Sequence, residues 1–117
     1  MHLLFIINDP PYGSERPYNA LRLANAVARR AEVTKVSVFL MADAVTGARS
    51  EQKTPEGYYN IERMLKRLRS VEGDVLLCGT CMDARGLKET HVVEGARRST
   101  MDELAALTVT ADRVLNF

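Results

Sequence analysis

The stretch Asp74–Gly86, DVLLCGTCMDARG, contains both cysteines of the chain, Cys78 and Cys81. Its continuous apolar run predicts a strand, Asp74–Cys78, that is covered on both faces as in a parallel sheet. The residues Cys81–Ala84 predict a short helix that ends at the following glycine. A strand that leads into a helix is the repeating unit of an α/β fold, and here the junction carries two thiols.

The same alternation of strands and helices extends to both ends of the chain. Further strands are predicted at Leu3–Ile7, Val36–Met41, Val92–Val93 and Asp112–Phe117. Helices are predicted at Tyr18–Arg30 after an N-cap at Ser14, at Asp43–Ala48, after an N-cap at Asn60, and after Ser99 or Thr100. The residues expected to face the core are Leu21, Ala24, Val27 and Ala28, then Ile61, Met64, Leu65 and Leu68, and finally Met101, Leu104, Ala105 and Thr108. This order predicts a single α/β domain over residues 1–117, with a parallel sheet and helices on both faces.

Composition excludes several classes of protein. Hydrophobic residues make up 46% and charged residues 26% of the 117 residues, as in an ordinary globular domain. The net charge of +1 gives no electrostatic footprint for nucleic acid or an anionic membrane. No apolar run approaches the roughly 20 residues that span a bilayer. The apolar stretch Leu3–Ile7 is too short for a signal peptide, so we expect a cytoplasmic protein with reduced thiols.

In a parallel sheet, ligands bind outside the carboxyl ends of the strands. The loop Asn8–Gly13 and the segment that begins at Cys78 both fall at this edge. If the residues after Cys78 are helical, its thiol lies at free backbone N–H groups that favour a thiolate. Arg85 adds a positive charge nearby. A thiol activated in this way is nucleophilic near neutral pH, and the alternative is a pair of buried, inert cysteines.

Two other uses of a Cys-x-x-Cys pair are disfavoured. Structural zinc needs four ligands, and the chain offers only His2 and His91 besides the two thiols, so no metal site is expected. A thioredoxin-type redox pair needs a proline later in the chain, yet all four prolines precede Cys78. An intramolecular disulfide remains an open alternative.

The remaining polar motifs have simpler interpretations. The stretch NDPPYGSERP, residues 8–17, lacks the glycines of a phosphate-binding loop and is read as a tight turn, with Tyr12 as a candidate wall of the thiol pocket. Asp43 and Asp83 are read as helix caps, and Arg97-Arg98 as solvated surface. The segment Arg49–Tyr59 is long for a loop in a compact domain, which indicates a functional or partner-held segment.

Five segments together resemble the DsrE/DsrF-like family, most closely its YchN-like branch. They are PYGSERPYNALRLA (residues 11–24), VFLMADAV (38–45), EGYYNIERML (56–65), CGTCMDARG (78–86) and ADRVLNF (111–117). They follow one another with similar spacing over essentially the whole chain. The resemblance implies a three-layer α/β/α sandwich with a mostly parallel sheet of about five strands.

The resemblance also implies an activity. Relatives form sulfur-relay complexes, and YchN-like members assemble into cytoplasmic homohexamers. In these relatives the active cysteine ends a central strand, and a glycine follows it about eight residues later. The corresponding residues here are Cys78 and Gly86. It carries sulfur as a persulfide and passes it to another thiol, without a cofactor. Cys81 departs from the relay members that have one cysteine in this loop.

The hypothesis is therefore a cytoplasmic sulfur-handling protein, a sulfur carrier of the sulfurtransferase type. Cys78 is the nucleophile and Cys81 a second candidate thiol; the backbone of Gly79 and Thr80, and the side chain of Arg85, stabilise the thiolate. Tyr12 and Asp43 would line the pocket, partly across a subunit interface, with Arg49–Tyr59 as a lid or an oligomer contact.

The expected partners are further copies of the chain and sulfur donor and acceptor proteins, but neither nucleic acid nor membrane. The alternatives are a non-catalytic assembly or small-ligand-binding module, and a dithiol redox protein that uses both cysteines.

Overall fold

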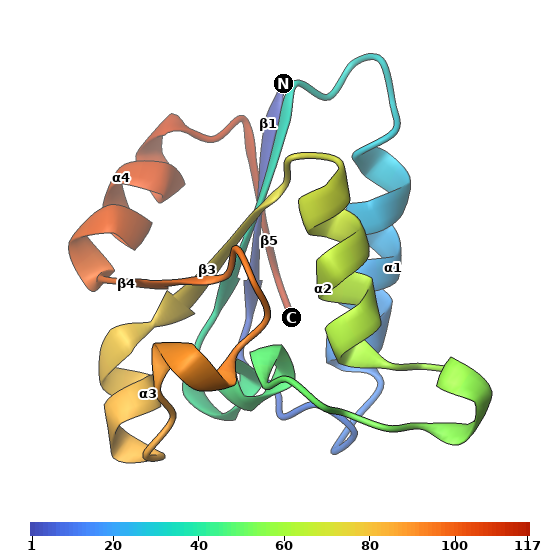
Figure 1. The fold of residues 1–117 in the computed structure, drawn as a ribbon. Helices are drawn as coiled ribbons and strands as arrows, with labels where there is room; N and C mark the ends of the chain where they lie inside the picture. The colour runs from blue at the N-terminus through green and yellow to red at the C-terminus, as the bar shows by residue number, and fades with distance from the viewer.

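Five strands form one parallel sheet in the computed structural model, which describes residues 1–117. The strands are β1 (His2–Ile7), β2 (Lys35–Leu40), β3 (Asp74–Cys78), β4 (Arg97–Ser99) and β5 (Arg113–Asn116). They lie in the order β4-β3-β2-β1-β5, and each neighbouring pair is parallel. All five carboxyl ends therefore lie at one edge of the sheet, at the bottom of Figure 1.

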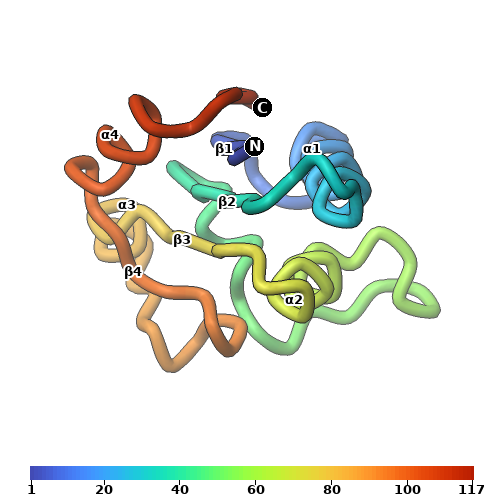
Figure 2. Tube along the Cα trace, turned by 90° about the horizontal axis from the view of Figure 1, so that it is seen from above, coloured from blue at the N-terminus to red at the C-terminus, as the bar shows by residue number.

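Helices cover both faces of this sheet. They are α1 (Arg16–Val27), α2 (Ile61–Ser70), α3 (Gly79–Ala84) and α4 (Met101–Thr110), with three 3-10 turns, η1 (Ala42–Ala48), η2 (Pro55–Gly57) and η3 (Glu89–His91). In Figures 1 and 2, α1 and α2 lie side by side on one face and α4 lies on the other. The predicted three-layer α/β/α sandwich is confirmed, and its sheet is wholly parallel. None of the helices has the length and apolar character needed to cross a bilayer.

The local signals at the start of α2 are borne out. The Asn60 side chain accepts the backbone N–H of Arg63 at 3.0 Å, which caps the helix as predicted. Ile61, Leu65 and Leu68 are buried against the sheet. The helix therefore begins where its cap predicts, and its apolar stripe packs against β3, α1 and η1.

The start of α1 differs from the prediction by one residue. The Ser14 hydroxyl accepts the backbone N–H of Arg16 at 3.3 Å, but the N-cap position belongs to Glu15, whose side chain caps nothing. Pro17 lies in the first turn, where a missing N–H leaves no helical bond unmade. The tight turn and the proline together fix where this helix begins.

The fourth strand lies elsewhere than predicted. Val92 makes only an isolated bridge to Arg49, and the strand beside β3 is Arg97–Ser99. The prediction of a strand at Val92–Val93 was wrong: both valines are buried, but Val92 makes only that bridge and the Val93 N–H donates to the Ala48 carbonyl, outside the sheet. A three-residue edge strand with two arginines has no apolar alternation to mark it.

The inward face of α4 is narrower than predicted. Thr100 caps the helix by accepting the Glu103 N–H at 3.2 Å. Of the four residues expected inside, only Leu104 is buried. The other three, Met101, Ala105 and Thr108, are exposed, and Leu107 takes their place against the core. This helix therefore packs on the core through Leu104 and Leu107, and most of its surface is exposed.

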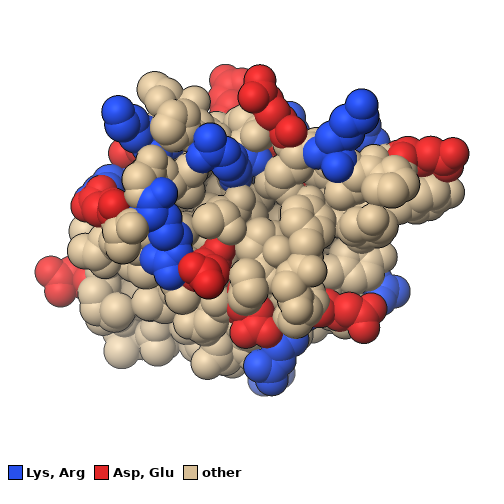
Figure 3. All heavy atoms as spheres, turned by 90° about the horizontal axis from the view of Figure 1, so that it is seen from below, with Lys and Arg blue, Asp and Glu red and all other residues tan.

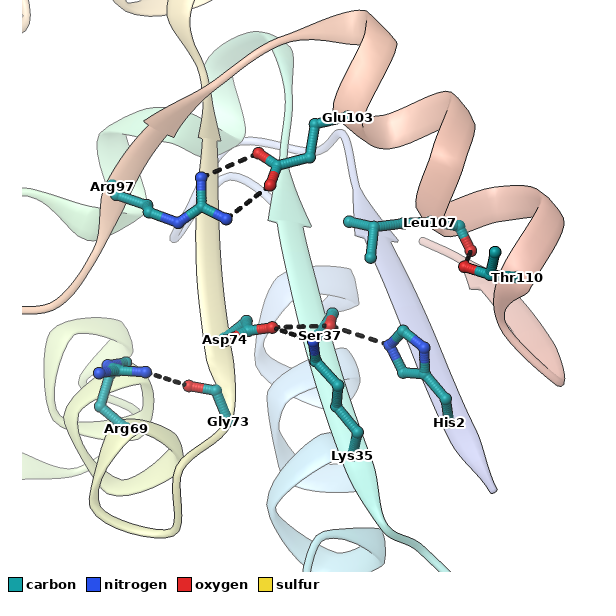
Figure 4. Close-up of polar contacts among 10 residues, drawn as sticks. All are labelled: His2, Lys35, Ser37, Arg69, Gly73, Asp74, Arg97, Glu103, Leu107 and Thr110. Atoms are coloured by element: carbon teal, nitrogen blue, oxygen red, sulfur yellow. Dashed lines mark hydrogen bonds and ion pairs between the residues drawn. The ribbon is translucent and has the colours of Figure 1, made fainter.

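A polar chain crosses the sheet beneath α4 near the amino ends of three strands (Figure 4). His2 Nε2 lies 2.9 Å from Ser37 Oγ, and the Ser37 hydroxyl donates to Asp74 Oδ2 at 3.2 Å. Lys35 Nζ lies 3.0 Å from the same carboxylate oxygen. Ser37 is fully buried, so these partners satisfy a hydroxyl that would otherwise destabilise the core. This chain links β1, β2 and β3 at the end opposite the cysteines.

Candidate functional site

Cys78 is both the last residue of β3 and the N-cap of α3. Its Sγ accepts the backbone N–H of Cys81 at 3.4 Å and lies 3.3 Å from Thr80 Oγ1. The residue is 9% exposed, so its thiol is nearly enclosed but still reachable. The buried run of β3 brings the thiol to the sheet edge, and the turn into α3 supplies its hydrogen-bond donors.

A small cavity of about 180 Å³ lies against this thiol. Residues from three neighbouring segments enclose it: the end of β3 with the start of α3, the end of β2, and the junction of β4 with α4. They are Cys78, Gly79 and Thr80, then Phe39 and Met41, then Arg98, Ser99, Thr100 and Met101. The predicted residues Gly79 and Thr80 therefore lie at the cavity with Cys78.

The two thiols differ in acidity. Burial raises the pKa of Cys78, but hydrogen bonds from the Cys81 thiol, the Thr80 hydroxyl and the local backbone outweigh it, so that its pKa lies below the ordinary value. Burial and the neighbouring Cys78 raise the pKa of Cys81, although the Ala42 N–H opposes this shift. Cys78 is therefore the first of the two to become a thiolate, which is the nucleophilic form.

Arg85 and Asp43 form an ion pair near Cys81, outside the cavity that Cys78 lines. Arg85 Nε lies 2.7 Å from Asp43 Oδ1, and its Nη1 donates to the Cys81 carbonyl at 2.9 Å. The predicted pair thus meets, but its contacts are with Cys81 and η1, and neither residue lines the cavity beside Cys78. Their contacts fasten α3 to η1 and hold the second thiol in place.

Arg98, which the sequence suggested was only solvated surface, lies at the mouth of the cavity. Its Nη1 and Nη2 each lie 2.7 Å from one carboxylate oxygen of Asp83. The guanidinium packs so closely on Gly79 that a Cβ there would lie 2.7 Å from Arg98 Nε. Gly79, directly after Cys78 at the end of β3, was the feature of the sequence that could have indicated a close approach of a side chain to the backbone here.

Tyr12 lies away from Cys78. Its hydroxyl accepts the Ile61 N–H at 3.1 Å and bonds to the Gln52 side chain, and its ring meets that of Tyr59 edge-on at 6.2 Å. Together with Tyr18 and Tyr58 these rings line a separate hollow of about 520 Å³, so all four tyrosines of the chain converge there. Within one chain, the structure does not bring Tyr12 to the thiol cavity.

The segment Arg49–Tyr59 is tied to the body of the protein at Gln52. The Gln52 amide donates to the Gly47 and Arg49 carbonyls at 2.7 Å, and its backbone N–H donates to Glu62 at 2.8 Å. Tyr58 remains 66% exposed. Seen from below in Figure 3, charged side chains surround a broad uncharged area at the edge where the strands end.

No group of three or more His, Cys, Asp or Glu side chains is placed to hold a metal ion. His2 bonds to Ser37, and His91 Nδ1 accepts the Lys88 backbone N–H at 3.1 Å. Ser37, His2 and Asp74 resemble a hydrolytic triad by composition only. The serine is fully buried and its hydroxyl donates to the aspartate, so the arrangement is structural.

A parallel sheet with a cysteine at the end of its third strand defines an α/β protein with a candidate reactive thiol. Residues 1–117 match the DsrE/DsrF-like family, and the chain belongs to that family. It is 42% identical to Protein YchN of Escherichia coli over 115 residues, which cover 98% of this chain and 97% of that one. Protein MJ0989 of Methanocaldococcus jannaschii is 38% identical over 117 residues, the full length of both chains.

Solved structures share the fold. The crystal structure of YchN from Escherichia coli matches with a TM-score of 0.93 at 41% identity, and the match covers 100% of this chain and 99% of that one. Protein MTH1491 from Methanobacterium thermoautotrophicum matches with a TM-score of 0.76 at 14% identity, over 99% and 98% of the two chains. The second match shows the fold alone.

Proposed function

We propose that this protein carries sulfane sulfur as a persulfide on Cys78 and passes it to an acceptor thiol. The observation that carries this proposal is the environment of the Cys78 thiol. The Thr80 hydroxyl, the Cys81 N–H and the Cys81 thiol form hydrogen bonds with it, and Cys78 lines a cavity of about 180 Å³. Membership of the DsrE/DsrF-like family, whose members include sulfur-relay proteins, supports the same chemistry.

The transfer follows from thiol chemistry. The Cys78 thiolate attacks the outer sulfur of a donor persulfide; a sulfur–sulfur bond forms at Cys78 while the donor leaves as a thiolate. The acceptor thiolate then attacks the outer sulfur of the Cys78 persulfide and regenerates the Cys78 thiolate. Electrons and atoms balance in each step, so the relay needs no cofactor. The apolar walls at Phe39 and Met41 keep water from the persulfide.

The proposal extends to assembly and compartment. The family resemblance points to a cytoplasmic homohexamer in which neighbouring copies complete the site. Exposed apolar side chains on α4 and β5 supply surface for such contacts: Met101 is 62%, Val109 83% and Val114 43% exposed. A reducing compartment would keep both thiols available. Static light scattering at micromolar concentration tests the assembly, and a monomer would contradict it.

Two alternatives predict different behaviour of the same thiols. A non-catalytic assembly or small-ligand-binding module would leave Cys78 no more reactive toward sulfur donors than an ordinary buried thiol. A dithiol redox protein would cycle between thiols and a disulfide without holding sulfur. The hydrogen-bonded Cys78 beside a cavity favours the carrier over the first alternative.

Intact-mass measurement tests the carrier function. Reduced protein is loaded anaerobically with inorganic polysulfide, freed of excess donor and measured at once. We expect a species one sulfur atom heavier in wild type and in Cys81→Ser, and none in Cys78→Ser. Absence of the adduct on Cys81→Ser, or an equal adduct on Cys78→Ser, would overturn the proposal.

A further inference from the structure

We propose that Cys81 is a resolving thiol, which discharges the Cys78 persulfide as hydrogen sulfide by forming a Cys78–Cys81 disulfide. This inference rests on the carrier function proposed above, because it begins from sulfur on Cys78. It gives the protein a second activity, reductive release of sulfide, at the same site. The contacts of Cys81, rather than its presence in a Cys-x-x-Cys motif, carry the argument.

The two cysteines are placed for a disulfide. Cys78 is the N-cap of α3 and Cys81 lies three residues later on the same helix, with its own N–H directed at Cys78 Sγ at 3.4 Å. The two thiols already hydrogen-bond to each other, so their sulfur atoms are neighbours. A disulfide needs Cβ atoms about 3.5–4.5 Å apart, and its formation therefore requires a small movement of the turn between β3 and α3. Both thiols are free in this structure, so the dithiol form is the starting point of the reaction.

The two thiols face different surroundings. Cys78 lines the cavity, whereas Cys81 does not and lies partly buried against the core. Sulfur delivered through the cavity therefore reaches Cys78 first, and Cys81 is its neighbouring thiol. The Cys81 thiolate attacks the inner sulfur of the Cys78 persulfide, with which its sulfur is already in contact, and the outer sulfur leaves as sulfide. The released sulfide leaves into the cavity.

The Cys81 sulfur also has a fixed position and a donor of its own. Its Sγ accepts the backbone N–H of Ala42 at 3.2 Å. Ala42 has a φ of 49°, a left-handed conformation that is uncommon for a residue with a side chain, and this conformation accompanies the N–H contact with the sulfur. The Arg85 guanidinium holds the Cys81 carbonyl at 2.9 Å. These contacts restrain the attacking thiol, and the Ala42 N–H partly offsets the rise in the Cys81 pKa that burial and Cys78 cause.

The reaction balances without an oxidant. Cys78–S–SH and Cys81–SH give the Cys78–S–S–Cys81 disulfide and one H₂S. The outer sulfur gains two electrons as it leaves as sulfide, and the two cysteine sulfurs lose them. A low-molecular-weight thiol or a protein dithiol then reduces the disulfide and restores both thiols for another cycle.

The decay of the persulfide tests this activity. Wild type and Cys81→Ser are loaded anaerobically with inorganic polysulfide, freed of donor, and followed by intact mass and by trapping of sulfide. In wild type we expect the one-sulfur adduct to give way to a species two hydrogen atoms lighter than the reduced protein, with one sulfide per chain. In Cys81→Ser we expect the adduct to last at least about tenfold longer and to yield no disulfide. Dithiothreitol should return the wild-type product to the dithiol.

The controls separate this inference from the carrier function. Unloaded wild type kept in parallel must stay reduced, which excludes oxidation by residual oxygen. Cys81→Ala, which has no hydroxyl, should retain the adduct as Cys81→Ser does. An adduct that lasts equally long in wild type and Cys81→Ser overturns the resolving role and leaves the carrier function standing. Absence of any adduct on Cys81→Ser overturns the carrier function and the resolving role together.

Discussion

The side chain of Arg98 lies across the backbone of Gly79, so close that a Cβ at residue 79 would stand 2.7 Å from Arg98 Nε and 2.8 Å from its Cζ. Gly79 directly follows Cys78, and the same guanidinium forms a two-point ion pair with Asp83. The absence of a side chain at residue 79 thus allows β4 to place a fixed cation beside the candidate thiol.

Replacement of Gly79 by alanine should therefore act through Arg98. We expect Gly79→Ala to lower the free energy of unfolding only modestly, because the added methyl displaces the flexible, exposed guanidinium of Arg98 and its ion pair with Asp83. In an Arg98→Ala background the same change should cost less, since the clashing group is gone. Urea denaturation of the four proteins gives the coupling energy, and strictly additive costs would contradict the contact.

Reactivity of Cys78 should extend to lower pH than that of an ordinary thiol. Burial raises its pKa, but the hydrogen bonds from Cys81 and Thr80 lower it further than burial raises it. Cys81→Ala and Thr80→Val each remove one donor, so the pH of half-maximal iodoacetamide labelling should move upward in both. Cys81→Ser retains a donor and should show the smaller shift. Equal profiles in all four proteins would mean that these bonds do not tune the thiol.

The outline of the fold and the position of Cys78 could be predicted because both depend on local pattern. A continuous apolar run marks β3, and Asn60 marks the start of α2. The place of β4 and the role of Arg98 could not be predicted, since the Arg97–Ser99 strand exists only through pairing with distant β3. Strand topology and the resemblance to a family both favoured Cys78 over Cys81, and the role of Cys78 stays a prediction.

The cap at Asn60 offers a matched test of helix capping. Asn60→Ala should destabilise the protein by about 1 kcal/mol, because the Arg63 N–H loses its partner. Glu15 occupies the same position at α1 but makes no capping bond, so Glu15→Ala should change stability by less than about 0.5 kcal/mol. Thermal denaturation of both variants compares the caps. Equal losses would mean that the Asn60 bond contributes nothing specific.

Glu103 should make the protein sensitive to acid. Arg97 forms a two-point ion pair with Glu103 (Figure 4). The hydrogen bonds from Arg97 and then Ser99 lower the pKa of this carboxyl from 4.5 to about 2. A carboxyl whose pKa is lowered on folding contributes stability above its unfolded pKa and loses it as the pH falls toward the folded value. With the side chain 34% exposed, we expect a contribution of about 1 kcal/mol, lost between pH 4.5 and about 2.

Comparison with Glu103→Gln isolates this contribution. The variant should be less stable than wild type at neutral pH, and the difference should shrink as the pH falls through this range. Urea midpoints measured at several pH values give the two curves. Parallel curves would show that the Arg97–Glu103 pair does not depend on the charge of the glutamate.

The two outer strands of the sheet are short and carry cationic side chains. β4 and β5 contain only three and four residues, and between them they carry Arg97, Arg98 and Arg113. Short outer strands with cationic side chains resist the strand-by-strand addition through which sheets fuse into aggregates. Growth of the sheet from one molecule into the next is thus disfavoured at both ends. The homohexamer proposed above would therefore form through side-chain contacts rather than through backbone pairing between outer strands.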